Sequence, residues 1–565
     1  MENKAAGTAK NYDVIVIGAG IAGTILSAIL ARQQISVLVI DAATHPRFVI
    51  GESMIPATSF MMRIMAERYD VPEIMHCSTL PFVQNHITSN SGTKRNFSFF
   101  YHREGQAQNP KESTQLPVPN IPYGPEAHLF RQDTDAYMMA VAIKYGAKVK
   151  QKTMITDIDF HEDGVNIKTT ANEEFSAKYI VDASGFNSVL AKRLGLREEP
   201  SRMKTNSRSL FTHMVGVKPF DEITNKDEHK LPNRIHNGTL HHIFDGGWLW
   251  VIPFDNNAKS TSILCSVGLQ YDLNRNPDNV PNKKPEEEFA DFLEAYPDVK
   301  KQFENAKPVR EWISSGGRLQ YSASKVIGKR FCLLAHASAF IDPLFSRGLA
   351  ITTETINSLA QRLIDAVRED DFNEERFEPV SRIIQQSYDT NDRLVSCSYT
   401  AFRDFNLWNA WYRVWALGQA FTSLRLTQVL SKFYKERDMQ ILLDIEKAPF
   451  IGSLCVDFAE FQPLFEKVAS TVEAVRDHGL STEEATKRIY GYYEEVQGFI
   501  PDQYEFLNPD KRFISKMDML SLYEVVMWGA QQAPETIRKL YFDIDESFLK
   551  GTKEPASNAV PVTTV

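Results

Sequence analysis

The stretch Asp13-Val-Ile-Val-Ile-Gly18-Ala-Gly20-Ile-Ala-Gly23 decides the fold of this chain. It predicts a short buried strand, a turn built on three glycines, and a helix that continues to about residue 34. The first glycine makes the tight turn, the second lets a pyrophosphate approach the backbone, and the third lets the helix pack closely on the strand. A second apolar strand at residues 36–41 completes a βαβ unit with parallel strands and a right-handed crossover.

The polar groups around this turn predict a dinucleotide site. The helix begins at Ile21 and Ala22, where unpaired N–H groups and the positive end of the helix dipole would face the phosphates. Asp41 ends the second strand and is placed to accept hydrogen bonds from a ribose. Because strand, glycines, helix and acid occur in register, the pattern favours dinucleotide binding over a purely structural turn.

Composition and charge restrict the class of protein. Of the 565 residues 43% are apolar and 24% charged, and the net charge is -9, which is typical of a folded globular protein. No basic stripe indicates a nucleic-acid partner. The apolar run from Val14 to Ala31 is interrupted by glycines, so a strand and a helix explain it better than a membrane span. Five widely spaced cysteines without a CxxC pair predict reduced thiols, no metal site and a cytoplasmic location.

The periodicity of the remaining chain predicts an α/β fold with three parts. A Rossmann-like nucleotide-binding module is interrupted by an antiparallel β-sheet substrate module and followed by a C-terminal helical domain. Within the sheet module, residues 81–123 read as a polar insertion rather than core. The predicted boundaries are 11–80, 129–195 and 326–368 for the nucleotide module, 81–128 and 196–325 for the sheet module, 369–550 for the helical domain, and 551–565 for a disordered tail.

One predicted helix of the C-terminal domain is rich in aromatic residues. Trp408, Trp411, Tyr412 and Trp415 recur at the spacing of a single helix face. Such a face is more often packed core than the wall of a substrate site, although it remains a candidate for such a wall.

The order of the later segments favours FAD over NAD. The nucleotide unit stands near the beginning of the chain, and the chain returns to the same site much later. Val181-Asp182-Ala-Ser-Gly185 and the strand–turn–helix at residues 331–350 resemble the second and third flavin segments of hydroxybenzoate-hydroxylase-like flavoproteins. Arg131 matches an arginine that those proteins place near the flavin; a surface salt bridge is the alternative. His336 stands where they usually carry an aspartate, and it is expected to contact the flavin instead.

Three further motifs resemble those of the flavin-dependent halogenases. Gly51-Glu52-Ser53 matches a GES loop beside the flavin, and Trp248-Leu-Trp250-Val-Ile252-Pro253 matches WxWxIP at every specified position. Phe340-Ile-Asp-Pro343-Leu-Phe-Ser346-Arg-Gly348 matches FxxPxxSxG. The resemblance covers about residues 12–365, and WxWxIP is its specific element. The C-terminal region is more like that of the phenol, pyrrole and carrier-linked halogenases than that of the tryptophan halogenases.

The resemblance implies a reaction in which reduced FAD, oxygen and chloride or bromide give hypohalous acid, which halogenates an electron-rich substrate. The stiff indoles of Trp248 and Trp250 would separate flavin from substrate; ordinary core packing, one indole on each face of the strand, is the alternative. Backbone N–H groups of the turn from Ser346 to Gly348 would hold the halide. Ser53, Pro343 and Leu349 would lie against the flavin. Since no second nicotinamide fingerprint is visible, a separate flavin reductase would supply reduced FAD.

The relay lysine of the family is the main departure. It follows the GES helix in a pattern like FxxKxGAxF and passes on the halogen, either as a hydrogen-bond donor to hypohalous acid or as a chloramine. The best local match, Phe82-Val-Gln-Asn85, places Asn85 at that position, and Lys94 is the nearby alternative, although an ordinary solvated loop lysine is expected there. An absent lysine leaves monooxygenation or desaturation, or an inactive flavin-binding partner protein, as alternatives.

Glu52 and the substrate also leave choices open. Glu52 could orient a substrate proton or act as a base, or it could cap the helix that begins near Met54. The substrate could be a free small molecule or an aromatic group tethered to a carrier protein, and the sequence does not choose between them.

Overall fold

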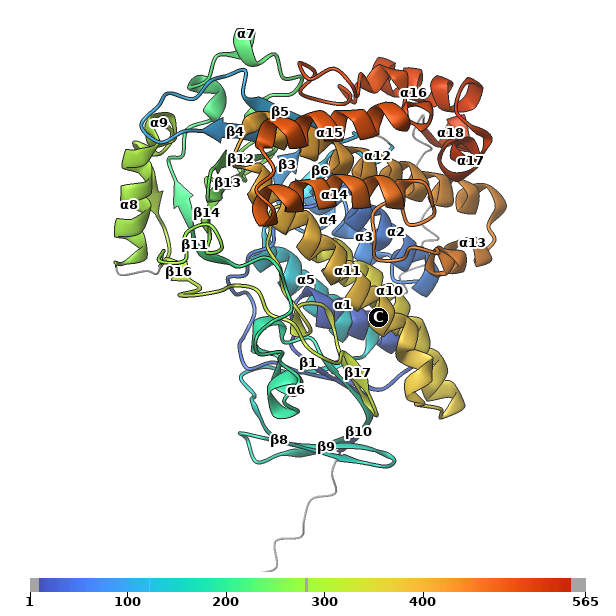
Figure 1. The fold of residues 1–565 in the computed structure, drawn as a ribbon. Helices are drawn as coiled ribbons and strands as arrows, with labels where there is room; N and C mark the ends of the chain where they lie inside the picture. Colours follow the sequence, from blue (N-terminus) through green and yellow to red (C-terminus); the bar gives the residue numbers. More distant parts are fainter. Residues whose placement is uncertain (1–9, 121, 280–282, 550–565) are drawn as a thin grey trace, which may run out of the picture.

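A mainly parallel sheet forms the lower part of the molecule in Figure 1. The structure is a computed structural model that describes residues 10–120, 122–279 and 283–549. Five parallel strands follow the order β18-β10-β1-β2-β7; β17 pairs with β18, and the β8–β9 hairpin pairs with β10, both antiparallel. The strands are β1 (Lys10–Ile17), β2 (Val37–Ile40), β7 (Lys148–Lys150), β8 (Ile155–His161), β9 (Gly164–Thr169), β10 (Glu174–Asp182), β17 (Ile327–Gly328) and β18 (Phe331–Leu333).

The first strand of this sheet is covered on both faces. Val14 and Val16 belong to the same hydrophobic core as three helices, α1 (Ile21–Arg32), α5 (Arg131–Tyr145) and α10 (Gly348–Glu369). Ile15 and Ile17 face the opposite way, toward the β8–β9 hairpin and α6 (Val189–Arg193). A parallel strand buried on both faces needs a continuous apolar run, which is the pattern of residues 14–17.

The glycine turn that follows β1 is packed so tightly that two of its glycines have no room for a side chain. Gly18 has φ +103°, and a Cβ there would lie 2.6 Å from the carbonyl oxygen of Ala183. A Cβ on Gly23 would lie 2.1 Å from the carbonyl oxygen of Gly18. Gly20 is different, because the nearest atom to its Cβ would be Nη2 of Arg47 at 4.0 Å. The turn is therefore closed behind Gly18 and Gly23 and open in front of Gly20.

The second sheet lies at the upper left of Figure 1 and follows the order β15-β11-β14-β13-β12-β4-β5, with β16 beside β11. Its neighbouring strands are antiparallel except β12 and β4, which are parallel. The expected all-antiparallel sheet is thus wrong at this pair, because β4 comes from a distant segment rather than from a hairpin. The strands are β4 (Asn96–His102), β5 (Ser113–Pro117), β11 (Ser207–Val215), β12 (Thr239–Phe244), β13 (Gly247–Pro253), β14 (Cys265–Asp272), β15 (Lys307–Pro308) and β16 (Ile313–Ser314).

The two faces of β13 serve different cores. Leu249 and Val251 pack toward α8 (Pro285–Ala295) and α9 (Pro297–Phe303), which cover the outer face of the sheet. Trp248 and Trp250 belong to the main core on the inner face. Residues two apart on a strand share a face, so the two indoles lie together and the alternative of one indole on each face is wrong.

The segment 81–123 contributes three buried strands to the core, which corrects its interpretation as a polar insertion. It contains most of α4 (Leu80–His86), the short strand β3 (Gly92–Lys94), and the strands β4 and β5 of the second sheet. Strand β3 pairs with β6 (Glu126–His128), so that Lys94 stands opposite Glu126 and Gly92 opposite His128. All residues of β3, β4, β5 and β6 are buried. Strand pairing satisfies their backbone groups, so the polar sequence does not need solvent.

The C-terminal part is helical, as predicted. Its helices, in the centre and upper right of Figure 1, are α11 (Glu374–Ala401), α12 (Phe405–Glu436), α13 (Gln440–Leu443), α14 (Phe461–Asp477), α15 (Thr482–Glu495), α16 (Met519–Gln531), α17 (Glu535–Ile537) and α18 (Glu546–Leu549). The aromatic face of α12 is buried against β5: the Trp408 indole N–H donates to Oγ1 of Thr114 at 3.1 Å, and the Tyr412 hydroxyl donates to the carbonyl of Gln115 at 2.6 Å. Core packing is therefore confirmed for this helix face.

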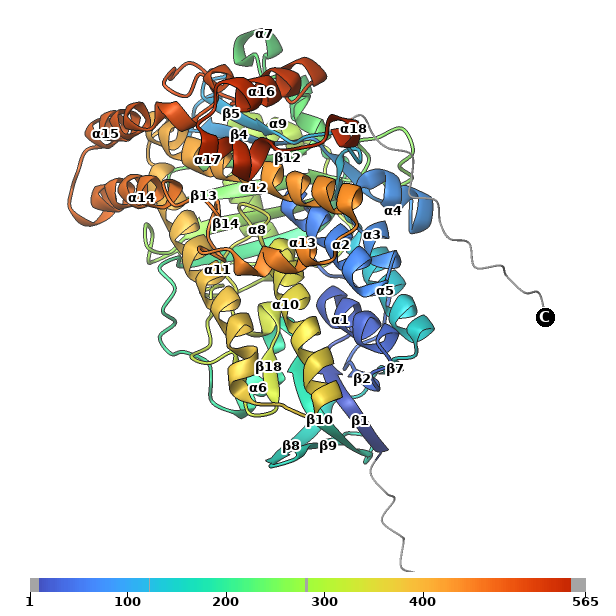
Figure 2. The same cartoon turned by 90° about the vertical axis from the view of Figure 1, so that its right-hand side faces the viewer.

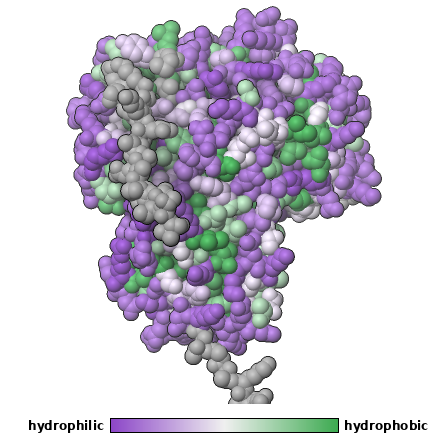
Figure 3. Space-filling model, turned by 180° about the vertical axis from the view of Figure 1, so that it is seen from behind, coloured by the Kyte–Doolittle hydropathy of each residue, from purple (hydrophilic) through white to green (hydrophobic). Residues whose placement is uncertain are grey.

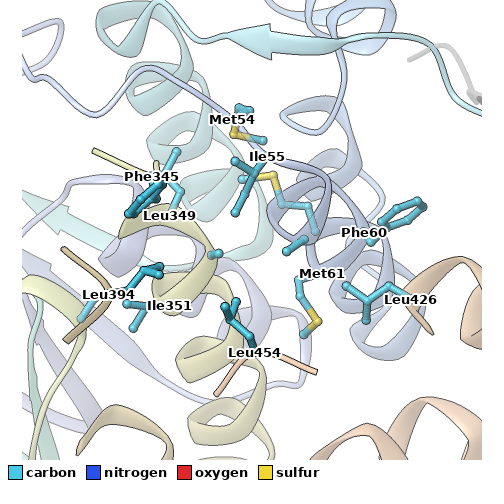
Figure 4. Packing of buried hydrophobic residues seen from close by; sticks show 14 of the residues in the cluster. Met54, Ile55, Phe60, Met61, Phe345, Leu349, Ile351, Leu394, Leu426 and Leu454 are labelled. Atoms are coloured by element: carbon cyan, nitrogen blue, oxygen red, sulfur yellow. The ribbon is translucent and has the colours of Figure 1, made fainter. Parts of the chain in front are cut away.

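One hydrophobic core connects all three parts of the chain. In Figure 4 the residues before and within α2 (Pro56–Tyr69), including Met54 and Met61, pack toward Leu349 and Ile351 of α10 and toward Leu394 and Leu426 of the C-terminal helices. Figure 2 shows α11 running beside α10 toward the parallel sheet. The short helices α3 (Glu73–His76) and α7 (Lys226–His229) complete the fold.

The α/β class with a second sheet and a helical C-terminal part is confirmed, whereas the exact boundaries of the three parts stay predictions. The tail 551–565 lies outside the described residues. The face seen in Figure 3 is mostly hydrophilic with small hydrophobic patches. Within the part of the chain that the structure describes, no helix is long and apolar enough to cross a membrane. All five cysteines are buried and unpaired.

We predict that Gly23→Ala destabilises the fold while Gly20→Ala does not. The added methyl at Gly23 meets a backbone oxygen that cannot move aside, and overpacking of this kind costs about 1–3 kcal/mol. At Gly20 the methyl meets open space. Urea unfolding of both variants measures the difference, and equal free energies of unfolding would contradict the packing described for this turn.

Candidate active site

A cavity of about 990 Å³ lies where the glycine turn, the second sheet and the beginning of α10 meet. Cofactor sites in proteins have volumes of this order, about 300–1,000 Å³. Most of the residues expected at a flavin site line it. These are Gly18, Gly20, Ile21, Ala22, Asp41, Glu52, Ser53, Arg131, Trp248, Trp250, His336, Pro343, Ser346, Gly348 and Leu349. Gly23, Asp182, Lys94 and Asn85 do not line it.

The end of the cavity beside the glycine turn suits a dinucleotide. Gly20 presents bare backbone toward it, and α1 begins at the next residue. Asp41 accepts the backbone N–H of Ala19 at 2.6 Å and forms a bidentate ion pair with Arg47, at 2.7 and 2.8 Å. Arg47, which sequence reasoning missed, adds a positive charge where a pyrophosphate would lie. The feature of the sequence that could have indicated Arg47 is its position six residues after Asp41, the acid at the end of the second strand.

Arg131 is buried rather than part of a surface salt bridge. It pairs with Asp135 one helical turn later, Nε to Oδ1 at 2.7 Å. Its Nη1 donates to the carbonyl oxygens of Ile50 and Gly51, at 3.1 and 3.0 Å. Arg131 therefore holds the GES loop against the cavity, and the surface alternative is wrong.

Asp182 does not line the cavity, and its expected contact with the cofactor stays a prediction. Its carboxylate lies behind the turn after β10 and accepts from the Ser184 hydroxyl at 2.6 Å and from the backbone N–H of Leu190 at 2.7 Å. Burial raises its pKa. The carboxylate shapes the turn whose residues 183–187 line the cavity, so its contribution to the site is indirect.

His336 packs against the beginning of α10. Its Nε2 would lie 3.0 Å from a Cβ placed on Gly348, which explains a glycine at the first position of that helix. Burial, together with the charge of Arg131, lowers the pKa of His336 to about 4. The imidazole is therefore neutral near pH 7 and offers the cavity a hydrogen-bonding group without a charge.

The two indoles form one wall of the cavity. Trp248 and Trp250 are nearly inaccessible to solvent, and their rings lie 5.8 Å apart at an angle of 47°. Opposite Trp250 on β14 stands Gly268, where a Cβ would lie 2.0 Å from the indole. The glycine thus makes room for the ring, and a larger residue would displace it.

Each indole N–H begins a hydrogen-bond chain that sequence reasoning did not find. Trp248 donates to the Tyr399 hydroxyl at 3.1 Å, which donates to Oδ2 of Asp342 at 2.9 Å. Trp250 donates to the Ser266 hydroxyl at 3.2 Å, which donates to Oε2 of Glu52 at 3.3 Å. Asp342 stands at an unspecified position inside the FxxPxxSxG segment, so the motif itself was the available signal.

Glu52 is a buried anchor and does not cap a helix. Helix α2 begins at Pro56 without a side-chain cap. Arg310 donates from Nε to Nδ1 of His213 at 3.1 Å; His213 then carries its proton on Nε2, which donates to Oε1 of Glu52 at 2.8 Å. The partners His213 and Arg310 come from distant segments and had no sequence signal.

The structure reverses the expected places of Lys94 and Asn85. Asn85 lies exposed on α4, away from the cavity. Lys94 is completely buried at the end of β3. Its Nζ donates to the hydroxyls of Ser53, at 2.6 Å, and Ser346, at 3.3 Å, both of which line the cavity. The assignment of Lys94 as a solvated loop lysine is wrong, because β3 buries it between two sequence motifs.

The parallel sheet, the open glycine turn and the indole wall together define a flavoprotein with a guarded reaction chamber. A family model described as tryptophan halogenase matches residues 82–443. The chain is 45% identical over 544 residues to monodechloroaminopyrrolnitrin halogenase PrnC of Pseudomonas fluorescens, covering 95% of each protein. It is 41% identical over 531 residues to tetracycline 7-halogenase of Kitasatospora aureofaciens, covering 94% of each.

The similarity extends to a solved structure. The crystal structure of halogenase PltM in complex with phloroglucinol and FAD superposes with a TM-score of 0.85 at 37% identity, covering 89% of this chain and 99% of that one. The chain therefore belongs to the tryptophan halogenase family. It is an FAD-dependent halogenase with a halide as co-substrate, and the expected fold, cofactor and class of enzyme are confirmed.

We predict that Asp342→Asn changes the pH dependence of the free energy of unfolding. Burial raises the pKa of Asp342 from its ordinary 3.8 to about 7. The stability that this group contributes is present below pH 3.8 and is lost as the pH rises toward 7, at about 1.4 kcal/mol per pH unit. Asparagine does not titrate. The difference in the free energy of unfolding between the variant and the wild type should therefore shift in favour of the variant as the pH rises through this range, and should stay constant above pH 7. Urea unfolding at a series of pH values measures this, and parallel curves would contradict it.

Proposed function

We propose that Lys94 passes a halogen from the flavin cavity to an uncharged aromatic substrate held in a second pocket. The observation that carries this proposal is the position of the lysine between two cavities. On one side its Nζ contacts Ser53 and Ser346, which line the flavin cavity. On the other side it lies 3.5 Å from the centre of the Phe97 ring, which lines an apolar pocket of about 260 Å³.

The environment of Lys94 suits transfer through a covalent nitrogen–halogen bond. Burial lowers the pKa of Lys94 well below its ordinary value, which favours the neutral, nucleophilic amine over the ammonium form. Bound reduced FAD supplies hypohalous acid from oxygen and halide. The amine attacks the halogen of this acid, an N–H proton and hydroxide leave as water, and a haloamine results. The substrate ring then takes the halogen and loses a proton, which restores the amine.

The cavity walls support the separation of oxidant and substrate. Trp248 and Trp250 are held by their own hydrogen-bond chains, so they form a fixed partition that a small anion passes and an aromatic ring does not. Ser346 has φ +55° in the turn before α10. The N–H of Ser346 itself donates to the carbonyl of Pro343, so the N–H groups that follow it at the N-terminus of α10 are the proposed donors to a halide.

The second pocket indicates the class of substrate. Its walls come from Pro56, from residues 116–119 at the end of β5 and just beyond it, and from α12 and α16; among the described residues that line the pocket none carries a charge. Tyr504, Ser423 and Thr427 offer hydroxyl groups. An uncharged ring with a few hydrogen-bonding groups fits this lining, whereas a free amino acid would bury unpaired charges.

The relatives support an aromatic or pyrrolic small molecule of natural-product biosynthesis. The substrates in the names of PrnC and tetracycline 7-halogenase are free small molecules. Chlorinases of a carrier-bound pyrrole are more distant, at 27% identity over 65% of this chain. We therefore favour a free small-molecule substrate over one that is tethered to a carrier protein. A separate flavin reductase is the inferred source of reduced FAD, and the five unpaired thiols are consistent with a cytoplasmic location.

We predict that Lys94→Met lowers the rate of halogenation by about 100-fold or more, the scale on which loss of a catalytic group acts. Oxidation of reduced FAD should continue, with peroxide or hypohalous acid released instead of halogenated product. The assay supplies FAD, a flavin reductase, NADH and bromide, and detects the bromine isotope pattern on an arylpyrrole by mass spectrometry.

Asn85→Ala is the matched control for the lysine. It changes the residue that the sequence pattern had placed at the relay position, and its exposure on α4 predicts unchanged halogenation. Halogenated product from Lys94→Met at the wild-type rate would overturn the relay. Oxygenated product without halogen from the wild type would indicate monooxygenation on the same scaffold.

We predict that Ala420→Phe raises the KM for the aromatic substrate by about tenfold or more while the affinity for FAD is unchanged. Ala420 lies on the α12 wall of the apolar pocket, and a phenyl group there fills space that the substrate needs. Ala530→Phe is the control, since Ala530 is exposed on α16 and does not line the pocket. An unchanged KM for Ala420→Phe would place the substrate elsewhere.

A further inference from the structure

We propose that Thr239 and His128 are positioning residues for Lys94, forming with Ser53 a one-way chain of hydrogen bonds that prevents Ser53 from donating into the lone pair of the lysine amine. This inference rests on the relay role proposed above for Lys94. It adds two residues that lie outside the flavin and halogenase motifs.

The chain is continuous from the amine to a backbone carbonyl. Lys94 Nζ lies 2.6 Å from Ser53 Oγ, which lies 2.8 Å from Thr239 Oγ1. Thr239 Oγ1 lies 3.0 Å from Nε2 of His128, whose Nδ1 lies 2.9 Å from the carbonyl oxygen of Pro253. The two-stranded sheet of β3 and β6, the strands β12 and β13 of the second sheet, and the GES loop meet here; the loop and β6 form a bridge between Ser53 and His128.

The direction of every bond follows from its last member. A carbonyl oxygen only accepts, so His128 must carry its proton on Nδ1. Burial lowers the pKa of His128 to about 3, so the ring is neutral and Nε2 has a free lone pair. The hydroxyl of Thr239 therefore donates its one proton to Nε2 of His128, and the hydroxyl of Ser53 donates its proton to Oγ1 of Thr239. Ser53 is left as an obligate acceptor toward Lys94.

This direction matters for the chemistry of the amine. A neutral amine has two N–H groups and one lone pair, and the lone pair is what attacks the halogen of hypohalous acid. A free serine hydroxyl beside it would rotate and donate into that lone pair, which would mask the nucleophile. Because the proton of Ser53 is engaged by Thr239, Ser53 accepts one N–H group and cannot donate into the lone pair, and a second N–H group donates to Ser346 at 3.3 Å.

The first test measures the tautomer of His128 in the wild-type protein. Protein with 15N-labelled histidine is examined by solid-state NMR between about pH 6 and 8, and His128 is identified by the signals missing in His128→Gln. We expect a neutral ring with the proton on Nδ1. A proton on Nε2, or a charged ring, would reverse or break the chain and overturn the proposal.

The second test compares Thr239→Val with Thr239→Ser. Valine keeps the shape of threonine but has no hydroxyl, so Ser53 is released; serine restores the link. We expect Thr239→Val to lower the kcat for halogenation by about tenfold, the scale of one functional hydrogen bond. The KM for the aromatic substrate, the Kd for FAD and the urea midpoint should stay close to wild type. Thr239→Ser should recover the halogenated product formed per flavin oxidised.

The outcomes separate this inference from the relay on which it rests. If Lys94→Met loses halogenation and Thr239→Val behaves like the wild type, the positioning chain is wrong and the relay stands. If Lys94→Met halogenates normally, both fall. A Thr239→Val variant that loses FAD binding and stability together with activity would show a structural role for Thr239 and would also overturn its assignment as a positioning residue.

Discussion

The burial of one amine constrains the structure around the site. An ammonium group in a dry interior is costly unless it is paired, and Lys94 meets two serine hydroxyls and an aromatic ring rather than a carboxylate. Its register neighbour Glu126 is engaged by Ser59 and has its pKa raised by burial to about 7. The site therefore favours neutral groups, and the segments that supply the hydroxyls have to meet at this point.

Other groups around the cavity are also kept neutral. His336 and His128 are held neutral by burial, and both indoles are fixed by neutral hydroxyl groups. Charged side chains line the cavity near the glycine turn, where Arg47 is bound to Asp41, at the loop that Arg131 holds, and just before α10 at Arg347. The Arg47–Asp41 pair lies at the end of the cavity that suits an anionic pyrophosphate.

The sequence predicted those parts of the fold and the site whose signals are local. The glycine turn, the parallel strands, the helical C-terminal part and the WxWxIP strand all depend on spacing within a short segment, and each was found. The burial of Lys94 depends on the pairing of β3 with β6 and of β4 with β12. These pairings join residues that are far apart in the chain. For this reason the polar segment 81–123 was predicted to be an insertion rather than part of the core. His213, Tyr399 and Thr239 were missed for the same reason, since their partners come from other strands or helices.

The hydrophobic core that connects the two sheets with the C-terminal helices limits how the enzyme exchanges its small molecules. Domains that open and close as rigid bodies usually meet across a modest, polar interface. Here α2, α10 and α12 share a single apolar interior, so a hinge between the parts would expose that interior to water. Small molecules then enter and leave the two cavities through rotation of individual side chains and loosening of helix ends. These are fast, local motions rather than slow movements of whole domains.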